Sequence, residues 1–160
     1  MQKESAKDCI DHFIKRAKNL GLKITPQRCA VFRIVSQSKD HPTADQVFHD
    51  VNQEFPNISY DTVNRTLLTF ADIGLIEVVQ TQGGPRRFDP VTDQHHHFQC
   101  LSCGKIIDFY NDNYDDLKIP DDMQKKFTVY NKRVVLSGRC WECRKQKKKS
   151  DFIKNSKAKN

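Results

Sequence analysis

Two Cys-x2-Cys pairs near the end of the chain constrain its fold more than any other feature. Cys100 and Cys103 form the first pair, Cys140 and Cys143 form the second, and 36 residues separate the pairs. Each pair can present two thiolates to one ion, and four sulfur ligands leave no coordination position open for water. The pattern predicts a closed, structural zinc site rather than a catalytic one. Two redox-active dithiols, or four unrelated cysteines, are the alternative.

The first 80 residues have the hydrophobic periodicity of short amphipathic helices. Thr25, which precedes Pro26, and Thr43 stand where N-caps are expected, and Gly74 is a typical helix stop. A β-rich segment, a Gly-Gly-Pro turn and a second short strand follow. We expect helices over residues 9–20, 26–39, 44–55 and 60–72, and strands over residues 75–79 and 86–88. Short helices followed by a β-hairpin indicate a winged helix-turn-helix.

The last of these helices is the candidate for reading DNA in the major groove. Its polar residues Thr62, Asn64 and Arg65, together with Arg86 after the turn, are the predicted DNA contacts. The charge pattern supports this only weakly, because Arg65 is the one basic residue between positions 40 and 80, where seven acidic residues lie. These residues alone do not exclude the alternative, a small helical domain that binds another protein.

The basic character of the chain is concentrated at its end. Residues 144–160 contain eight Lys/Arg and one acidic residue, and they account for the whole formal net charge of +7. Residues 1–143 have no formal net charge. A chain of 160 residues is too short for a large multi-domain enzyme. Since neither a membrane span nor a signal peptide is evident, we expect a cytoplasmic protein with a disordered basic tail.

Three consecutive histidines precede the first cysteine pair. Strand side chains alternate between faces, so His95 and His97 would point together while His96 points away. Asp108 would join them if the next strand pairs back across the intervening turn, and Asp89 lies in the connector between the two halves. Imidazoles and carboxylates without cysteine suit exchangeable Fe(II), Mn(II) or Zn(II). A solvated histidine cluster without a metal is the alternative.

Taken together, these motifs resemble the ferric uptake regulator family of metal-dependent repressors over about residues 8–143. The motifs are Gly21-Leu-Lys-Ile-Thr-Pro-Gln-Arg28, His41-Pro-Thr-Ala-Asp45, Ser59-x-x-Thr-Val63, Arg87-Phe-Asp89, His95-x-His97-x-x-Cys100-x-x-Cys103-Gly-Lys105 and Cys140-x-x-Cys143. The resemblance implies an α+β chain with an N-terminal winged helix-turn-helix DNA-binding domain and a C-terminal α/β dimerisation domain that contains the four-cysteine zinc site. It also implies a homodimer that represses transcription from a palindromic operator in double-stranded DNA.

On this resemblance we expect four segments. Residues 1–84 form the winged-helix DNA-binding domain, residues 85–92 a hinge, residues 93–143 the dimerisation and metal-binding domain, and residues 144–160 the basic tail. A regulatory Fe(II) or Mn(II) is implied as well, one per chain, in addition to one structural zinc. Its implied ligands are His41, Asp89, His95, His97 and Asp108. Ligands from both domains would let the metal set the angle between them, and hence DNA affinity.

Within the family, single positions are most similar to the peroxide-responsive repressors. Asp89 and Asp108 stand where iron-uptake repressors usually have glutamate, and no cysteine lies among the implied ligands, which disfavours the zinc-uptake branch. This branch implies that peroxide oxidises His41 and His95 of the iron-loaded protein, so that metal and DNA are released. An iron-uptake repressor is the near alternative and a small zinc metalloenzyme the distant one. We expect no enzymatic activity, because neither HExxH nor a nucleophile elbow is present.

One residue of the predicted DNA-reading helix departs from the family pattern. Asn64 stands where the family usually has a tyrosine that contacts DNA. An asparagine can make a bidentate contact with adenine in the major groove. We therefore expect altered operator specificity rather than loss of binding.

Overall fold

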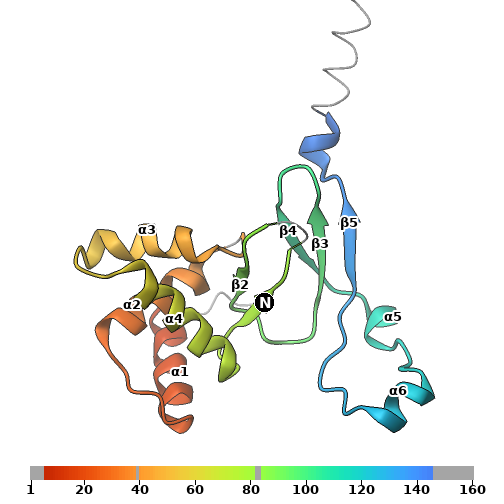
Figure 1. Cartoon of the computed structure of the whole chain (residues 1–160), viewed down its shortest axis with the longest axis horizontal. Coiled ribbons are helices and arrows are strands. Elements are labelled where there is room, and N and C mark those ends of the chain that lie inside the picture. The colour runs from red at the N-terminus through yellow and green to blue at the C-terminus, as the bar shows by residue number, and fades with distance from the viewer. Residues whose placement is uncertain (1–5, 39, 82–83, 146–160) are drawn as a thin grey trace, which may run out of the picture. The chain divides into compact units, whose positions relative to one another are not determined.

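The computed structural model describes residues 6–38, 40–81 and 84–145, and the chain divides into two compact units, residues 1–92 and 93–160 (Figure 1). Most of the predicted basic tail, residues 146–160, lies outside the described residues. In the ranges described, no helix is both long enough and apolar enough to cross a membrane.

Four helices build most of the first unit, as predicted. Thr25 caps the second helix, Thr43 caps the third in a reciprocal capping box with Gln46, and Ser59 caps the fourth. Each cap satisfies a backbone N–H group that would otherwise lack a partner at the start of its helix. The helices are α1 (Ala6–Asn19), α2 (Pro26–Gln37), α3 (Ala44–Glu54) and α4 (Tyr60–Asp72).

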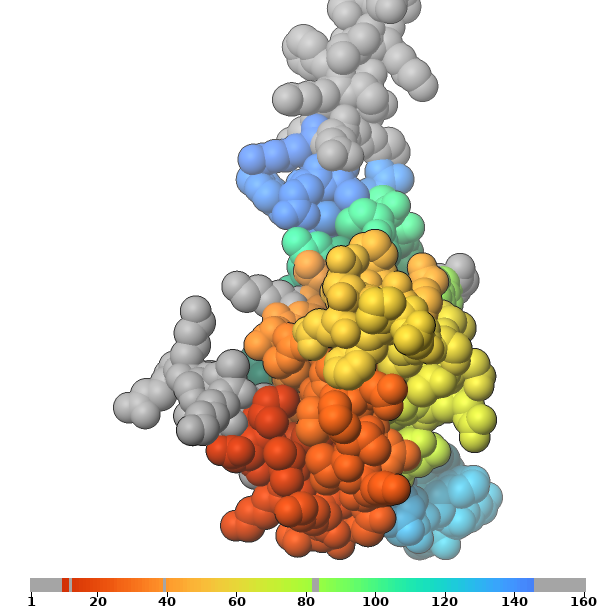
Figure 2. Space-filling view, turned by 90° about the vertical axis from the view of Figure 1, so that its left-hand side faces the viewer, coloured from red at the N-terminus to blue at the C-terminus, as the bar shows by residue number. Residues whose placement is uncertain are grey.

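A single apolar core holds these helices together. Phe13 of α1 stacks on Phe32 of α2 with ring centroids 4.2 Å apart, and Phe70 of α4 meets both rings at steep angles. Residues of α2 and α3 form one contiguous surface in the space-filling view (Figure 2). Because Val63 and Leu67 bury one face of α4 in this core, the opposite face of α4 is left exposed.

The wing of the first unit is a two-stranded antiparallel hairpin. Strand β1 (Glu77–Val79) pairs with β2 (Arg87–Asp89). Residues 85–92, which we expected to form a hinge, therefore include a strand that satisfies its backbone hydrogen bonds within the first unit.

A three-stranded sheet with β3 in the middle forms the second unit (Figure 1). The pairing of β3 with β4 across the turn at Gly104, whose φ is +72°, confirms the sequence prediction. Strand β5 runs parallel to β3, and two short helices lie in the connection that leads to it; neither β5 nor these helices were predicted. The elements are β3 (His96–Cys100), β4 (Ile106–Phe109), α5 (Asp112–Asp115), α6 (Asp121–Lys126) and β5 (Val135–Gly138).

Candidate metal centres and DNA-binding surface

The four paired cysteines come together in the second unit. Cys100 ends β3, Cys103 lies in the following turn, and Cys140 and Cys143 follow β5. Their sulfur atoms all lie within 4.8 Å of one another, and those of Cys103 and Cys140 are 3.8 Å apart. A tetrahedron with metal–sulfur bonds of about 2.3 Å has edges of about 3.8 Å. The donor set and its spacing therefore fit zinc.

The thiols of this cluster differ strongly in acidity. The backbone N–H of Cys140 donates to Cys100 Sγ at 3.3 Å, and this hydrogen bond contributes most to lowering the pKa of Cys100 to about 6. Hydrogen bonds with the thiols of Cys140 and Cys103 raise the pKa of Cys143 to about 12. One thiolate thus forms readily, whereas full ionisation of the set needs a bound cation to balance its charge.

His95, His97 and Asp108 form a second set of possible ligands in the same unit. The register of β3 and β4 places His97 opposite Asp108, and His97 Nε2 lies 3.4 Å from Asp108 Oδ1. His95 Nε2 lies 2.9 Å from His97 Nε2 and 3.8 Å from Asp108 Oδ1. Adjacent ligands of an octahedral ion with bonds of about 2.1 Å are about 3.0 Å apart. Two histidines and one carboxylate on one face suit Fe(II) or Mn(II).

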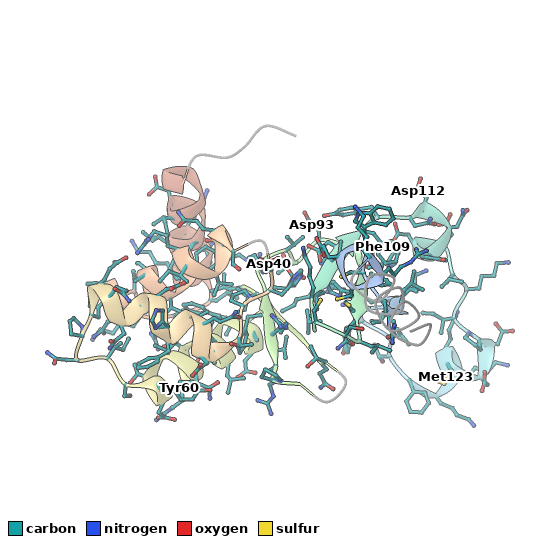
Figure 3. All side chains as sticks on the ribbon, turned by 90° about the horizontal axis from the view of Figure 1, so that it is seen from above. Asp40, Tyr60, Asp93, Phe109, Asp112 and Met123 are labelled. Carbon is teal, nitrogen blue, oxygen red and sulfur yellow. The ribbon has the colours of Figure 1, made fainter. Side chains whose placement is uncertain are left out.

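Backbone contacts orient the His95 ring for this role. Its Nδ1 lies 2.7 Å from the carbonyl oxygen of Asp93, which is labelled in Figure 3. Because a carbonyl can only accept, Nδ1 carries the proton and the lone pair of Nε2 faces His97 and Asp108. His95 and His97 are both buried, whereas Asp108 is partly exposed.

His96 points to the other face of β3, as strand alternation predicts. The backbone N–H of Val134 donates to His96 Nδ1 at 3.3 Å, so Nε2 is the protonated atom, and it lies 3.3 Å from Asp115 Oδ1. The sequence offered no signal for this pair, because Asp115 lies in the connection that was not predicted to be helical.

The remaining two predicted ligands, His41 and Asp89, lie together in the first unit. His41 Nε2 is 3.4 Å from Asp89 Oδ2, and both residues are buried. The backbone N–H of Val91 donates to Asp89 Oδ1 at 2.8 Å, which fixes the carboxylate. His41 follows Asp40, labelled in Figure 3, in the loop between α2 and α3. An imidazole and a carboxylate are thus presented by different elements to one point.

The predicted DNA contacts lie along the exposed side of α4 and on the wing. Thr62 and Arg65 are exposed and line a hollow of about 230 Å³ that also includes Arg28 of α2. Asn64 lies on the other edge of α4 and lines a groove of about 380 Å³ together with Arg86 of the wing. The helix and the wing thus present polar side chains on adjoining surfaces of one unit, which suits contacts to bases and phosphates.

A winged helix accompanied by a four-thiolate cluster and histidine–carboxylate sets defines a metal-binding transcriptional regulator. The chain matches the Ferric uptake regulator family over residues 19–137, and it belongs to this family. Family members are DNA-binding transcriptional regulators and not enzymes, which confirms our expectation on activity and excludes the zinc metalloenzyme. Its membership of this family makes the protein a metal-dependent repressor.

Similar proteins include members of both the peroxide and the iron branch. The peroxide-responsive repressor PerR of Staphylococcus epidermidis is 34% identical over 143 residues, which cover 87% of this chain and 95% of that relative. The ferric uptake regulator of Helicobacter pylori, whose structure is described as having three functional metal-binding sites, is 25% identical with a TM-score of 0.70; the match covers 90% of this chain and 97% of that one. PerR of Streptococcus pyogenes is 26% identical with a TM-score of 0.50 and respective coverages of 89% and 98%.

Proposed function

We propose that this protein is a homodimeric, peroxide-sensing repressor whose DNA affinity depends on Fe(II) or Mn(II). The observation that carries the proposal is the set formed by the buried His95 and His97 and the partly exposed Asp108, with donor spacings suited to these ions. The Staphylococcus epidermidis relative, which is named a peroxide-responsive repressor, supports the assignment.

In this proposal the four cysteines hold one structural zinc per chain. Cys100 ends β3 and Cys103 lies in the turn after it, whereas Cys140 and Cys143 follow β5, so one ion would tie together the same ends of two parallel strands. Thiols that must stay reduced to bind zinc fit a cytoplasmic location.

The regulatory ion would take ligands from both units. The first unit offers His41 and Asp89, and the second offers His95, His97 and Asp108. A shared ion would restrict the angle between the units, because each group of ligands is held rigidly within its own unit. In a two-fold dimer the recognition helices must reach successive major grooves about 34 Å apart, so a fixed angle favours the DNA-binding arrangement.

The proposed homodimer would form through the second unit and would bind a palindromic operator. Strand β5 is at the edge of the sheet, and its Val135 and Leu136 side chains are 53% and 41% exposed. Phe127 and Tyr130, in the connection before β5, are more exposed still. Apolar side chains beside an unpaired strand edge are typical of a surface that a second copy covers.

Peroxide sensing requires ligands that can be oxidised at the regulatory site. Bound Fe(II) would catalyse the transfer of one oxygen atom from hydrogen peroxide into a ring C–H bond of an imidazole ligand, so that the imidazole is the net two-electron reductant and the second oxygen atom leaves as water. His41 and His95 are the expected targets. An imidazole modified in this way no longer presents the same nitrogen lone pair. The site would then lose its metal, and the protein would release DNA.

Mass spectrometry of peptides from the peroxide-treated protein tests this step. The Fe(II)-loaded protein, treated with stoichiometric hydrogen peroxide, is expected to gain one oxygen on peptides that contain His41 or His95. The Mn(II)-loaded protein is the control and is expected to stay unmodified. Equal oxidation with both metals, or no added oxygen on either histidine, would contradict the proposal.

An iron-uptake repressor is the second candidate, because the chain is also similar to the Helicobacter pylori ferric uptake regulator, with a TM-score of 0.70. Treating the Fe(II)-loaded protein with hydrogen peroxide separates the two functions. An iron-uptake repressor would release DNA on chelation of Fe(II), and peroxide would oxidise neither histidine.

Asn64 is proposed to read the operator rather than to strengthen binding in general. Replacing Asn64 with alanine should cost about 1–3 kcal/mol on the preferred operator, the usual energy of a bidentate base contact, and little on random DNA. Duplexes selected from a random pool with the Mn(II)-loaded protein provide the operator, and fluorescence anisotropy measures both affinities. Asn113→Ala, in the second unit, is the control. Equal losses on selected and random duplexes would show that Asn64 carries no sequence preference.

A further inference from the structure

We propose that Arg87 is a positioning residue for the regulatory site, because it holds the backbone of His41 from the wing. Arg87 lies in β2, and its Nη1 donates to the carbonyl oxygens of Asp40 at 3.3 Å and of His41 at 3.1 Å. All these residues belong to the first unit. The inference rests on the proposed function, because Arg87 is argued to set the geometry of His41, which is a proposed metal ligand.

His41 needs such support because its own sequence context disfavours its conformation. Its φ is +47°, and it is the one residue other than glycine with a positive φ in the described ranges. It also precedes Pro42, and residues before proline normally adopt extended conformations. A strained backbone persists only where surrounding contacts determine it, and such residues cluster at functional sites.

The same strand fixes both proposed ligands of the first unit. Phe88 N–H donates to the carbonyl of Pro42 at 3.0 Å, and Thr43 forms an isolated antiparallel bridge with Arg87. Asp89 ends the strand, two residues beyond Arg87. Strand β2 therefore places one ligand through its own backbone and the other through the Arg87 guanidinium.

This arrangement couples the wing to the metal. One guanidinium nitrogen, Nη1, contacts both carbonyls of the loop, and the planar, charged guanidinium keeps this nitrogen in a fixed place at the end of the Arg87 side chain. A movement of β2 must then move His41 and Asp89 together. By reciprocity, DNA contacts that hold the wing would strengthen metal binding, just as the metal strengthens DNA binding.

The experiment measures Mn(II) affinity of the full chain in its zinc-containing form by isothermal titration calorimetry. Arg87→Ala should bind Mn(II) about 10- to 100-fold more weakly, the range typical when a contact that orients a metal ligand is lost. Arg87→Lys should recover part of this loss. Arg16→Ala is the matched control, since Arg16 also donates to a backbone carbonyl of the first unit, that of Gly74 at 2.7 Å, and should leave Mn(II) affinity unchanged.

A second readout avoids the metal altogether. In the Mn(II)-free protein, NMR signals of the His41 imidazole should shift in Arg87→Ala and not in Arg16→Ala, while zinc content and thermal unfolding distinguish a local change from misfolding. Wild-type Mn(II) affinity in Arg87→Ala, with His41→Ala clearly weakened, would overturn the positioning role alone. If neither His41→Ala nor Arg87→Ala weakens Mn(II) binding, the proposed regulatory site falls together with this inference.

Discussion

Replacing Cys103 with serine will release the zinc and unfold the second unit, while the first unit stays folded. The two units differ in what stabilises their folded state. The first contains a core of fifteen buried residues, whereas in the described part of the second, residues 93–145, Ile106 is the only buried apolar side chain besides Cys100 and Cys140. Structural zinc contributes about 10–16 kcal/mol in small domains, which matches or exceeds the whole stability of a typical domain.

Zinc content measured by atomic absorption, together with amide signals in NMR spectra, gives the readout. Signals from residues 93–145 should collapse to the shift range of an unfolded chain, while those of the first unit keep their dispersion. Cys29→Ser is the control, since Cys29 lies on α2 in the first unit and is not one of the four paired cysteines, and burial raises the pKa of its thiol. A folded second unit in zinc-free Cys103→Ser would mean that the cluster is dispensable.

Replacing His97 with alanine will abolish the response of DNA binding to Mn(II) without removing the zinc. His97 is buried, and its Nε2 lies within 3.4 Å of both His95 Nε2 and Asp108 Oδ1, so its loss opens the middle of the ligand set. Since residues that only support a ligand contribute about 10- to 100-fold to metal affinity, loss of a ligand should weaken Mn(II) binding by more than about 100-fold.

Anisotropy titrations with selected operator duplexes, at increasing Mn(II), measure the effect. The wild-type protein should gain DNA affinity with Mn(II), and the variant should stay at its metal-free value. His49→Ala, an exposed histidine on α3 that belongs to neither proposed site, should behave as wild type. A variant that still responds to the same Mn(II) concentrations would remove His97 from the regulatory site.

Local sequence signals predicted the first unit well. Its helices begin at Thr25, Thr43 and Ser59 because these side chains satisfy the first backbone donors, and this effect depends only on neighbouring residues. The β3–β4 hairpin was equally local, since Gly104 allows the turn and the alternation of His95, His96 and His97 follows from strand geometry. Strand β5 was missed, because its partner β3 lies far away in the chain.

Residue types and spacing indicated which chemistry to expect: four thiols for one closed zinc site, and histidines with aspartates for either an exchangeable ion or a solvated cluster. Tertiary structure decided which atoms meet. Cys140 reaches Cys100 only because β5 runs parallel to β3 and pairs Gly138 with Cys100. His41 has a positive φ before a proline, and Arg87, far along the chain, donates to its carbonyl. Such contacts join distant segments, and local conformational preferences, which act between neighbours, carry no information about them.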